Sequence, residues 1–189
     1  ASIFQRRESN VRSYCRSFPA VFSRAKGATL TDVDGRAYID FLSGAGALNY
    51  GHNHPAIKSK VLEYLASDGI VTSLDLHTRA KHGFIEALSQ IVLAPRGLDY
   101  RFAFPGPTGT NAIELALKLA RRATGRHNVI AFTNGYHGMT LGALAASGTK
   151  SKRAGAGVAL SGVTRLPYDG YMGPDVDTSL LLERMLEDA

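Results

Sequence analysis

The stretch GPTGTNAIE, residues 106–114, decides the fold of this chain. It lies between a short apolar run, Tyr100–Phe104, which predicts a strand, and an amphipathic run, Asn111–Ala123, which predicts a helix. A glycine-rich turn that opens a helix at the carboxyl end of a parallel strand directs free backbone N–H groups and the positive end of the helix dipole at one point. This stretch therefore predicts a phosphate-binding loop.

The same nine residues also have a purely structural interpretation. Thr110 or Asn111 can cap the helix, and Asn111 and Glu114, three positions apart, form a loose variant of the capping box. The glycine spacing matches neither a Walker A loop nor a dinucleotide fingerprint. On this stretch alone, phosphate binding and plain helix capping both stay open.

A second glycine-containing loop follows the next predicted strand, Val129–Phe132. In this loop Tyr136 offers a flat ring for stacking on a heteroaromatic ligand, and Gly135 and Gly138 permit a close approach to the backbone. The alternative is a core tyrosine followed by a capping histidine, His137. Because both loops follow strands at the same edge of the predicted sheet, they are expected to converge.

Strand, helix and strand at this spacing form a βαβ unit, which indicates a parallel sheet in a three-layer α/β domain. A further strand is predicted at Val163–Leu166 and a last helix near Ser179–Leu186. Residues 96–189 are therefore expected to form the first part of a large domain. Three or four strands leave sheet edges and helix faces uncovered, so the natural domain is expected to continue beyond Ala189.

The chain before residue 96 divides into two predicted segments, 1–55 and 56–95. In the first segment, Asp32–Gly35 predicts a hairpin loop with glycine in the left-handed conformation, and Gly44–Ala47 predicts a loop before a helix. The second segment predicts two helices, one after Pro55 and one over about 78–93. Their expected buried faces are Ile57, Val61, Leu62 and Leu65, and Phe84, Leu88, Ile91 and Val92.

Composition describes a globular chain, with 44% hydrophobic and 20% charged residues. The net charge of +6 favours a solvated basic face or attraction of anionic substrates. A nucleic-acid-binding surface is not indicated, because the sequence shows no recognition helix and no row of stacking aromatics.

The single cysteine, Cys15, has no partner for an internal disulfide and predicts a cytoplasmic location. No signal-peptide core or run of 18 apolar residues is present, so a membrane anchor is not expected.

Two histidines, His52 and His54, flank one residue in a predicted turn before Pro55. A metal site needs a third and usually a fourth ligand, and no such residue stands nearby in the sequence. A structural turn is therefore expected here, and no metal.

Three ordered motifs resemble those of the class-III aminotransferases of fold type I: Gly51–Pro55, Thr108–Thr110 and Gly135–Gly138. The resemblance extends over nearly all of the chain. Within the family, similarity is greatest to the branch that exchanges an amino group between L-2,4-diaminobutyrate and 2-oxoglutarate at the start of ectoine synthesis. That similarity is carried by Val11–Tyr14, Gly44–Pro55 and Pro105–Ala112.

The resemblance implies pyridoxal 5'-phosphate as the cofactor. Gly109 and Thr110 would contact its phosphate through backbone N–H groups and a hydroxyl, Tyr136 would stack on the pyridine ring, and His137 would lie beside that ring. The chain departs from many family members at Asn111, where they carry an acid, and at Tyr136, where they carry phenylalanine. The second departure keeps the ring for stacking, and the first is typical of the diaminobutyrate branch.

In this family the loop that matches residues 44–50 lines the substrate pocket, which makes Asn49 and Tyr50 candidate contacts for a substrate carboxylate or amine. The resemblance also implies a homodimer with the active site at its interface. The expected substrates are amino acids and 2-oxo acids, with aspartate 4-semialdehyde and glutamate as the products. Ornithine and γ-aminobutyrate are alternative amino donors.

The reaction needs a lysine that forms a Schiff base with the cofactor and an acid that keeps the pyridine nitrogen protonated. In the family both lie further along the chain than residue 189, and none of Lys118, Lys150 and Lys152 stands in the matching context. No catalytic residue is therefore assigned, and residues 1–189 alone are expected to be inactive. The alternative from another functional class is a non-catalytic module for binding or assembly.

Overall fold

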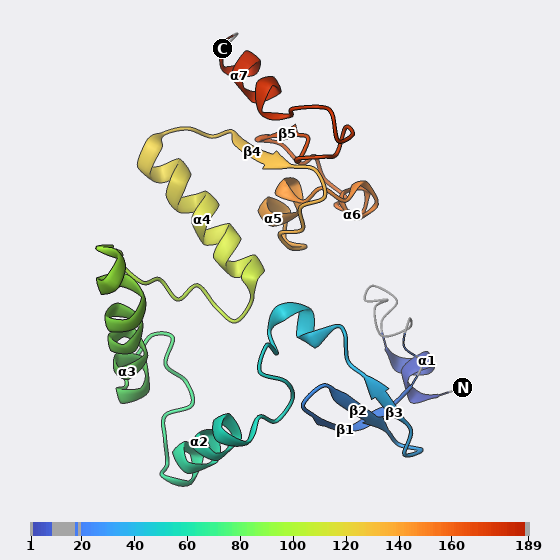
Figure 1. Ribbon diagram of the computed structural model, residues 1–189, viewed down its shortest axis with the longest axis vertical. Coiled ribbons are helices and arrows are strands. Elements are labelled where there is room, and N and C mark those ends of the chain that lie inside the picture. The colour runs from blue at the N-terminus through green and yellow to red at the C-terminus, as the bar shows by residue number, and fades with distance from the viewer. Residues whose placement is uncertain (1, 9–17, 19, 188–189) are drawn as a thin grey trace. The chain divides into compact units, whose positions relative to one another are not determined.

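The computed structural model describes residues 2–8, 18 and 20–187, and these form two compact units, residues 1–71 and 72–189 (Figure 1). Cys15 and the stretch Val11–Tyr14 lie outside the described residues. The predicted domain boundaries near residues 55 and 95 stay a prediction.

The first unit contains a short helix, α1 (Ile3–Arg7), and a three-stranded antiparallel sheet of β1 (Phe22–Lys26), β2 (Thr29–Asp32) and β3 (Ala37–Ile39). The hairpin predicted between β2 and β3 is confirmed, with Gly35 at φ +84°. The buried carboxylate of Asp32, at the end of β2, shapes this turn. Its Oδ1 accepts the backbone N–H groups of Asp34 at 3.0 Å and Arg36 at 2.8 Å.

A loop and a helix complete the first unit. The loop contains a left-handed 3-10 turn, η2 (Ser43–Gly46), and it ends at an antiparallel bridge between His52 and Gly27. The helix, α2 (Pro55–Ala66), begins with proline at its first position, where the missing N–H has no helical partner to lose. The predicted loop followed by a helix is therefore confirmed.

Gly51 brings the loop end against the β1–β2 turn, and we expect Gly51→Ala to destabilise the first unit by about 2 kcal/mol. A Cβ at Gly51 would lie 2.9 Å from Gly27 Cα, and its backbone φ is +78°. Gly35→Ala is the matched control, because Gly35 has a similar φ of +84° but no atom within 4 Å of an added Cβ. The control should cost about 1 kcal/mol from the backbone conformation alone. Amide hydrogen exchange of β1–β3 measures both losses, and equal losses would contradict the clash.

The second unit opens with a helix whose last turns change type. α3 (Arg79–Leu88) starts at Thr78, whose hydroxyl accepts a first-turn backbone N–H at 3.2 Å. The chain continues as a π turn, η3 (Ser89–Leu93), and a 3-10 turn, η4 (Ala94–Arg96). The prediction of one helix over about 78–93 is therefore right in position, although its final turn is not α-helical.

A strand predicted at Tyr100–Phe104 is absent from the described structure. A strand is defined by its ladder of hydrogen bonds to a neighbour, and no described strand of this unit pairs with residues 100–104. The apolar run is therefore suited to a strand, but in the described structure no neighbouring strand pairs with it. The prediction was wrong because β propensity depends on the context that a sheet supplies.

The parallel sheet predicted for this unit is present as a pair of strands, β4 (Val129–Phe132) and β5 (Val163–Leu166). It is preceded by α4 (Gly109–Thr124), which starts two residues before the predicted helix. Two short helices, α5 (Leu141–Ala146) and α6 (Lys150–Ala154), connect the strands, and α7 (Ser179–Glu187) follows them (Figure 1). The described apolar core consists of Leu117, Ala131, Ala143, Leu144, Ala145, Ala146 and Leu166.

Several helix faces expected to be buried are exposed. On α2, Ile57, Val61, Leu62 and Leu65 are each about half exposed, and on the α3–η3 segment Phe84, Ile91 and Val92 are also exposed. Helical spacing predicts which side chains share a face, but burial requires a partner surface. The spacing was therefore right and the predicted burial was wrong for these residues.

Candidate functional site

The N-terminus of α4 is capped by Thr108, not by the predicted Thr110 or Asn111. The Thr108 hydroxyl accepts the Asn111 N–H at 3.4 Å, and Asn111 Oδ1 accepts the Thr108 N–H at 3.2 Å, which makes a capping box. The predicted caps were wrong because Gly109 and Thr110 already have helical backbone conformation, which moves the capping position back to Thr108.

Gly109 and Thr110 therefore occupy the first two positions of a 16-residue helix. N–H groups in the first turn of a helix have no carbonyl partner within it, and they carry the positive end of the helix dipole. A Cβ added at Gly109 would meet no atom within 4 Å, so the space beside this residue is open. The helix start provides both the donors and the room for an anion.

The second loop packs on this helix start through Gly138. The Gly138 backbone has φ +132°, and an added Cβ would lie 2.2 Å from the Thr110 hydroxyl oxygen and 2.8 Å from Thr110 Cβ. Only glycine permits this approach. The structure thus places the two glycine-containing loops in contact, as the sequence led us to expect.

Ser147 holds the second loop in place and was missed by the sequence reasoning. Its side chain is fully buried and accepts the His137 N–H at 3.0 Å, and its one hydroxyl proton is shared between the carbonyl oxygens of Ala143 at 2.9 Å and Gly138 at 3.3 Å. The only sequence signal was a lone hydroxyl at the end of the apolar run LGALAAS. A buried hydroxyl needs such partners, because an unpaired one costs about 1–3 kcal/mol.

Glu114 also acts across the loops, not within its own capping box as predicted. Its Oε1 accepts the Ala143 N–H at 3.0 Å and the Thr140 hydroxyl, both at the start of α5. The hydrogen bond from Thr140 contributes most to holding the pKa of the Glu114 carboxyl below its ordinary value, and the Ala143 N–H adds to it. Glu114 is therefore a carboxylate that joins α4 to α5 directly beside the second loop.

Two arginine side chains support the far end of α5. Arg153 donates to the Ser147 carbonyl at 2.6 Å, and Arg165 donates to the Ala145 carbonyl and, at 3.3 Å, to the Ser147 carbonyl. Cations are favourable at the C-terminal end of a helix, where carbonyl groups lack partners. Burial, together with the nearby positive charge of Arg153, lowers the pKa of Arg165.

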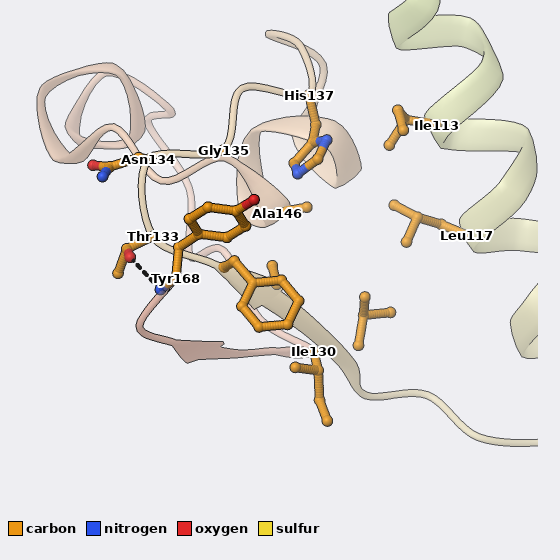
Figure 2. A pocket seen from close by; sticks show the side chains of 12 residues that line it. Ile113, Leu117, Ile130, Thr133, Asn134, Gly135, His137, Ala146 and Tyr168 are labelled. Carbon is orange, nitrogen blue, oxygen red and sulfur yellow. Dashed lines mark hydrogen bonds between the residues drawn. The ribbon is translucent and has the colours of Figure 1, made fainter. Parts of the chain in front are cut away.

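A pocket of about 500 Å³ opens between α4, β4 and the second loop (Figure 2). Ile113 and Leu117 face it from α4, Ile130 from β4, and Gly135 and His137 from the loop. Tyr136 is not among its lining residues, and the residue is 59% exposed. The structure therefore places His137 at the pocket and leaves Tyr136 outside its wall.

The predicted substrate contacts lie in the first unit. Asn49 is exposed, and Tyr50 is 75% exposed with its ring edge-on to the ring of His54, at a centroid distance of 6.3 Å. The His52 side chain points toward Asp40, and its Nε2 lies 2.7 Å from Asp40 Oδ2. Among residues 2–8, 18 and 20–187, no three histidine, cysteine or acidic side chains gather as they would around a metal ion.

Comparison with known proteins identifies the family. Residues 11–188 match the sequence profile described as Aminotransferase class-III. The chain belongs to the class-III aminotransferase family.

None of Lys118, Lys150 and Lys152 lines the pocket of Figure 2.

Several curated relatives are named diaminobutyrate--2-oxoglutarate transaminase. The Vibrio cholerae protein is 59% identical over 186 residues, which are 98% of this chain and 45% of the relative. The Halomonas elongata protein is 54% identical over 187 residues, which are 98% of this chain and 44% of the relative. The chain therefore spans less than half the length of these curated relatives.

Solved aminotransferase structures share the fold. A Bacillus anthracis aminotransferase has a TM-score of 0.76 at 22% identity. The match covers 97% of this chain and 43% of the chain of that protein. The taurine:2-oxoglutarate aminotransferase of Bifidobacterium kashiwanohense, solved with pyridoxal phosphate and glutamate, has a TM-score of 0.71 at 26% identity, covering 89% of this chain and 39% of that one. The predicted fold type I α/β architecture is confirmed. No described helix is long and apolar enough to cross a membrane.

Proposed function

We propose that this chain provides the phosphate-binding part of a pyridoxal 5'-phosphate site in an aminotransferase. The observation that carries the proposal is the contact of Gly138 with Thr110, which joins the two glycine-containing loops at the open N-terminus of α4. An anionic phosphate fits this place, because unpaired N–H groups and the helix dipole both favour negative charge. The family assignment and the cofactor in the taurine aminotransferase structure support the same cofactor here.

Each proposed contact follows from the chemistry of its residue. Gly109 and Thr110 donate backbone N–H groups to the phosphate, and the Thr110 hydroxyl is placed to add a third donor. His137 lines the pocket beside mostly apolar residues, where it would lie next to the cofactor ring. Tyr136 is proposed to stack on the ring, for which its exposed side chain has to turn toward the pocket.

When bound, pyridoxal phosphate would supply an electron sink at the carbon that bears the exchanged amino group, which is C4 of diaminobutyrate and Cα of glutamate. This chain's own residues bind and orient: the helix start holds the anionic group, and Glu114 and Ser147 hold the second loop against it. The lysine that moves the proton and the acid at the pyridine nitrogen are proposed to come from the part of the family's length beyond residue 189.

The proposed reaction is amino-group exchange between L-2,4-diaminobutyrate and 2-oxoglutarate, giving aspartate 4-semialdehyde and glutamate. The names of relatives 53–59% identical to this chain support that substrate pair. Asn49 and Tyr50 are the proposed contacts for substrate carboxylate or amine. A homodimer and a cytoplasmic location are further proposals.

The test joins residues 1–189 to the part of the Vibrio cholerae transaminase that lies beyond its match with this chain; we call this protein the completed chain. With pyridoxal phosphate, the completed chain should form glutamate from 2-oxoglutarate with diaminobutyrate as donor at least about tenfold faster, in kcat/KM, than with ornithine or γ-aminobutyrate. Residues 1–189 alone should form none.

Three results would contradict parts of this proposal. A preference for ornithine or γ-aminobutyrate would replace the proposed donor. Activity of residues 1–189 alone would show that the catalytic lysine lies within them. A completed chain that folds, as judged by circular dichroism, but neither binds pyridoxal phosphate nor transfers an amino group would favour the non-catalytic module.

A further inference from the structure

The loop that carries Asn49 and Tyr50 has a strained backbone. Ser43, Gly44 and Ala45 are consecutive left-handed residues, with φ of +49°, +57° and +55°. Serine and alanine rarely adopt this conformation, because their Cβ crowds the backbone. Such a turn persists only where surrounding contacts enforce it.

Both ends of this loop are tied to the β1–β2 turn. Gly27 and His52 exchange two backbone hydrogen bonds of 2.9 Å each, and Asp40 donates its N–H to the Ala28 carbonyl at 2.8 Å. The residues between these ties, Leu42–Gly51, contain no other strand pairing. Hydrogen bonds within the loop and at its two ends therefore contribute to holding its conformation.

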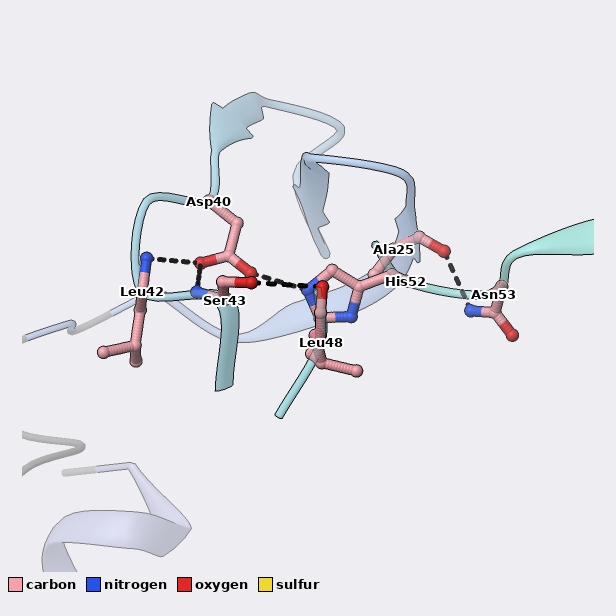
Figure 3. Close-up of polar contacts among 7 residues, drawn as sticks. All are labelled: Ala25, Asp40, Leu42, Ser43, Leu48, His52 and Asn53. Carbon is pink, nitrogen blue, oxygen red and sulfur yellow. Dashed lines mark hydrogen bonds and ion pairs between the residues drawn. The ribbon is translucent and has the colours of Figure 1, made fainter. Parts of the chain in front are cut away.

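The Asp40 carboxylate connects the two ends to the strained turn (Figure 3). Its Oδ1 accepts the backbone N–H groups of Leu42 at 2.9 Å and Ser43 at 3.0 Å, while its Oδ2 lies 2.7 Å from His52 Nε2. The side chain of Asp40 is only 8% exposed and that of His52 21%. These bonds, first that from the Ser43 N–H and then that from His52, hold the pKa of Asp40 below its ordinary value.

A second bond crosses the loop inside this clamp. The Ser43 hydroxyl donates to the Leu48 carbonyl at 3.1 Å, so the turn gripped by Asp40 also fixes the chain just before Asn49 and Tyr50 (Figure 3). Leu48 and Tyr50 line a hollow of about 380 Å³ together with His54 and Ile57 of the α2 start. Tyr50 follows two residues after Leu48, so its backbone continues directly from the segment that this bond fixes.

We propose that Asp40 and His52 are positioning residues, which clamp the Leu42–Gly51 loop in its strained conformation and so hold Asn49 and Tyr50 ready for the amino donor. The clamp itself rests only on the contacts above. Its consequence for the amino donor rests on the proposed function. His52 thus has a task that its position in the GHNHP motif alone does not show.

The experiment compares His52→Ala, His52→Gln and His82→Ala. Alanine removes the donor to Asp40, whereas the glutamine amide can still reach Oδ2. His82→Ala is the matched control, because His82 also pairs with a carboxylate, Glu86, but at 3.8 Å and with its side chain 78% exposed. Amide hydrogen exchange of residues 42–51 is measured in the 189-residue chain and in the completed chain, and transaminase kinetics are measured in the completed chain.

His52→Ala should speed exchange in residues 42–51 about tenfold or more, since local opening is no longer opposed by the clamp. It should raise KM for the amino donor about tenfold with kcat within about threefold, the pattern of lost ground-state binding. His52→Gln should recover most of both values, and His82→Ala should match the parent. A purely structural role would lower the folded fraction without this split between KM and kcat.

Each negative result would contradict a different part of the proposal. Unchanged exchange of residues 42–51 in His52→Ala would overturn the clamp. Faster exchange with an unchanged KM would overturn the positioning role. If the parent completed chain shows no activity with any donor, the proposed function has failed, and the exchange measurement in the 189-residue chain still decides whether the clamp exists.

Discussion

Gly138→Ala should weaken pyridoxal phosphate binding by the completed chain about 100-fold, which corresponds to about 2.7 kcal/mol. The added Cβ would meet Oγ1, Cγ2 and Cβ of Thr110 at 2.2, 2.6 and 2.8 Å. Thr110 is β-branched and lies in the first turn of α4, so it cannot move aside by rotation alone. The second loop must therefore withdraw from the helix start, which separates the two halves of the phosphate site.

Isothermal titration calorimetry with pyridoxal phosphate and, separately, with inorganic phosphate measures this effect. Gly157→Ala is the control, because Gly157 has φ +72° but no atom within 4 Å of an added Cβ. It should bind the cofactor within about twofold of the parent, since only backbone strain distant from the site is added. Equal affinity of Gly138→Ala and the parent would contradict the proposed meeting of the loops at the phosphate.

Glu114→Ala should lower the free energy of unfolding of the second unit by about 3 kcal/mol near neutral pH. It removes the acceptor for the Thr140 hydroxyl and the Ala143 N–H, and it leaves the start of α5 without its carboxylate. Because α5 supplies four of the seven buried apolar residues given above, loosening its start exposes much of the described core.

The loss should also depend on pH, with a sign fixed by the direction of the pKa shift. Because the Thr140 hydroxyl and then the Ala143 N–H lower the pKa of Glu114 in the folded state, its stabilisation is complete above the ordinary carboxyl pKa. The part that depends on the ionised carboxylate disappears as the pH falls through the lowered pKa of the folded state. Urea unfolding from about pH 7 to about pH 3 should therefore show the difference between the parent and Glu114→Ala falling to about half in acid, where the neutral carboxyl still accepts a hydrogen bond.

Glu114→Gln separates charge from hydrogen bonding in this measurement. The amide oxygen still accepts one bond, so the loss near neutral pH should be about half that of Glu114→Ala. The difference from the parent should vanish in acid, where the parent carboxyl is also neutral. A Glu114→Ala loss that stays constant across this pH range would show that the ionised carboxylate is not what holds α5.

Local features of this chain were predictable because they depend on neighbours in the sequence. The Asp32–Gly35 turn, the strands Val129–Phe132 and Val163–Leu166, and the last helix all lie where composition and periodicity placed them. The two glycine-containing loops and their meeting could also be expected, because glycines at the ends of parallel strands share one edge of a sheet.

Contacts between distant residues were not predictable in the same way. Sequence spacing suggested that Glu114 helps to cap its own helix, whereas the folded chain uses it at the start of α5. Ser147 gave almost no signal, and His52 read as part of a turn before the structure paired it with Asp40. Which acceptor meets which donor depends on how separate elements are placed, and periodicity carries no information about that placement.

The sequence by itself therefore determined the family, the order of the elements and the positions of the glycines that the two loops require. Only the tertiary structure decided that Glu114 and Ser147 hold the second loop and that Tyr100–Phe104 forms no strand. The physical reason is that backbone preferences act over a few residues, whereas strand pairing, burial and buried hydrogen bonds exist only when another part of the chain supplies the partner.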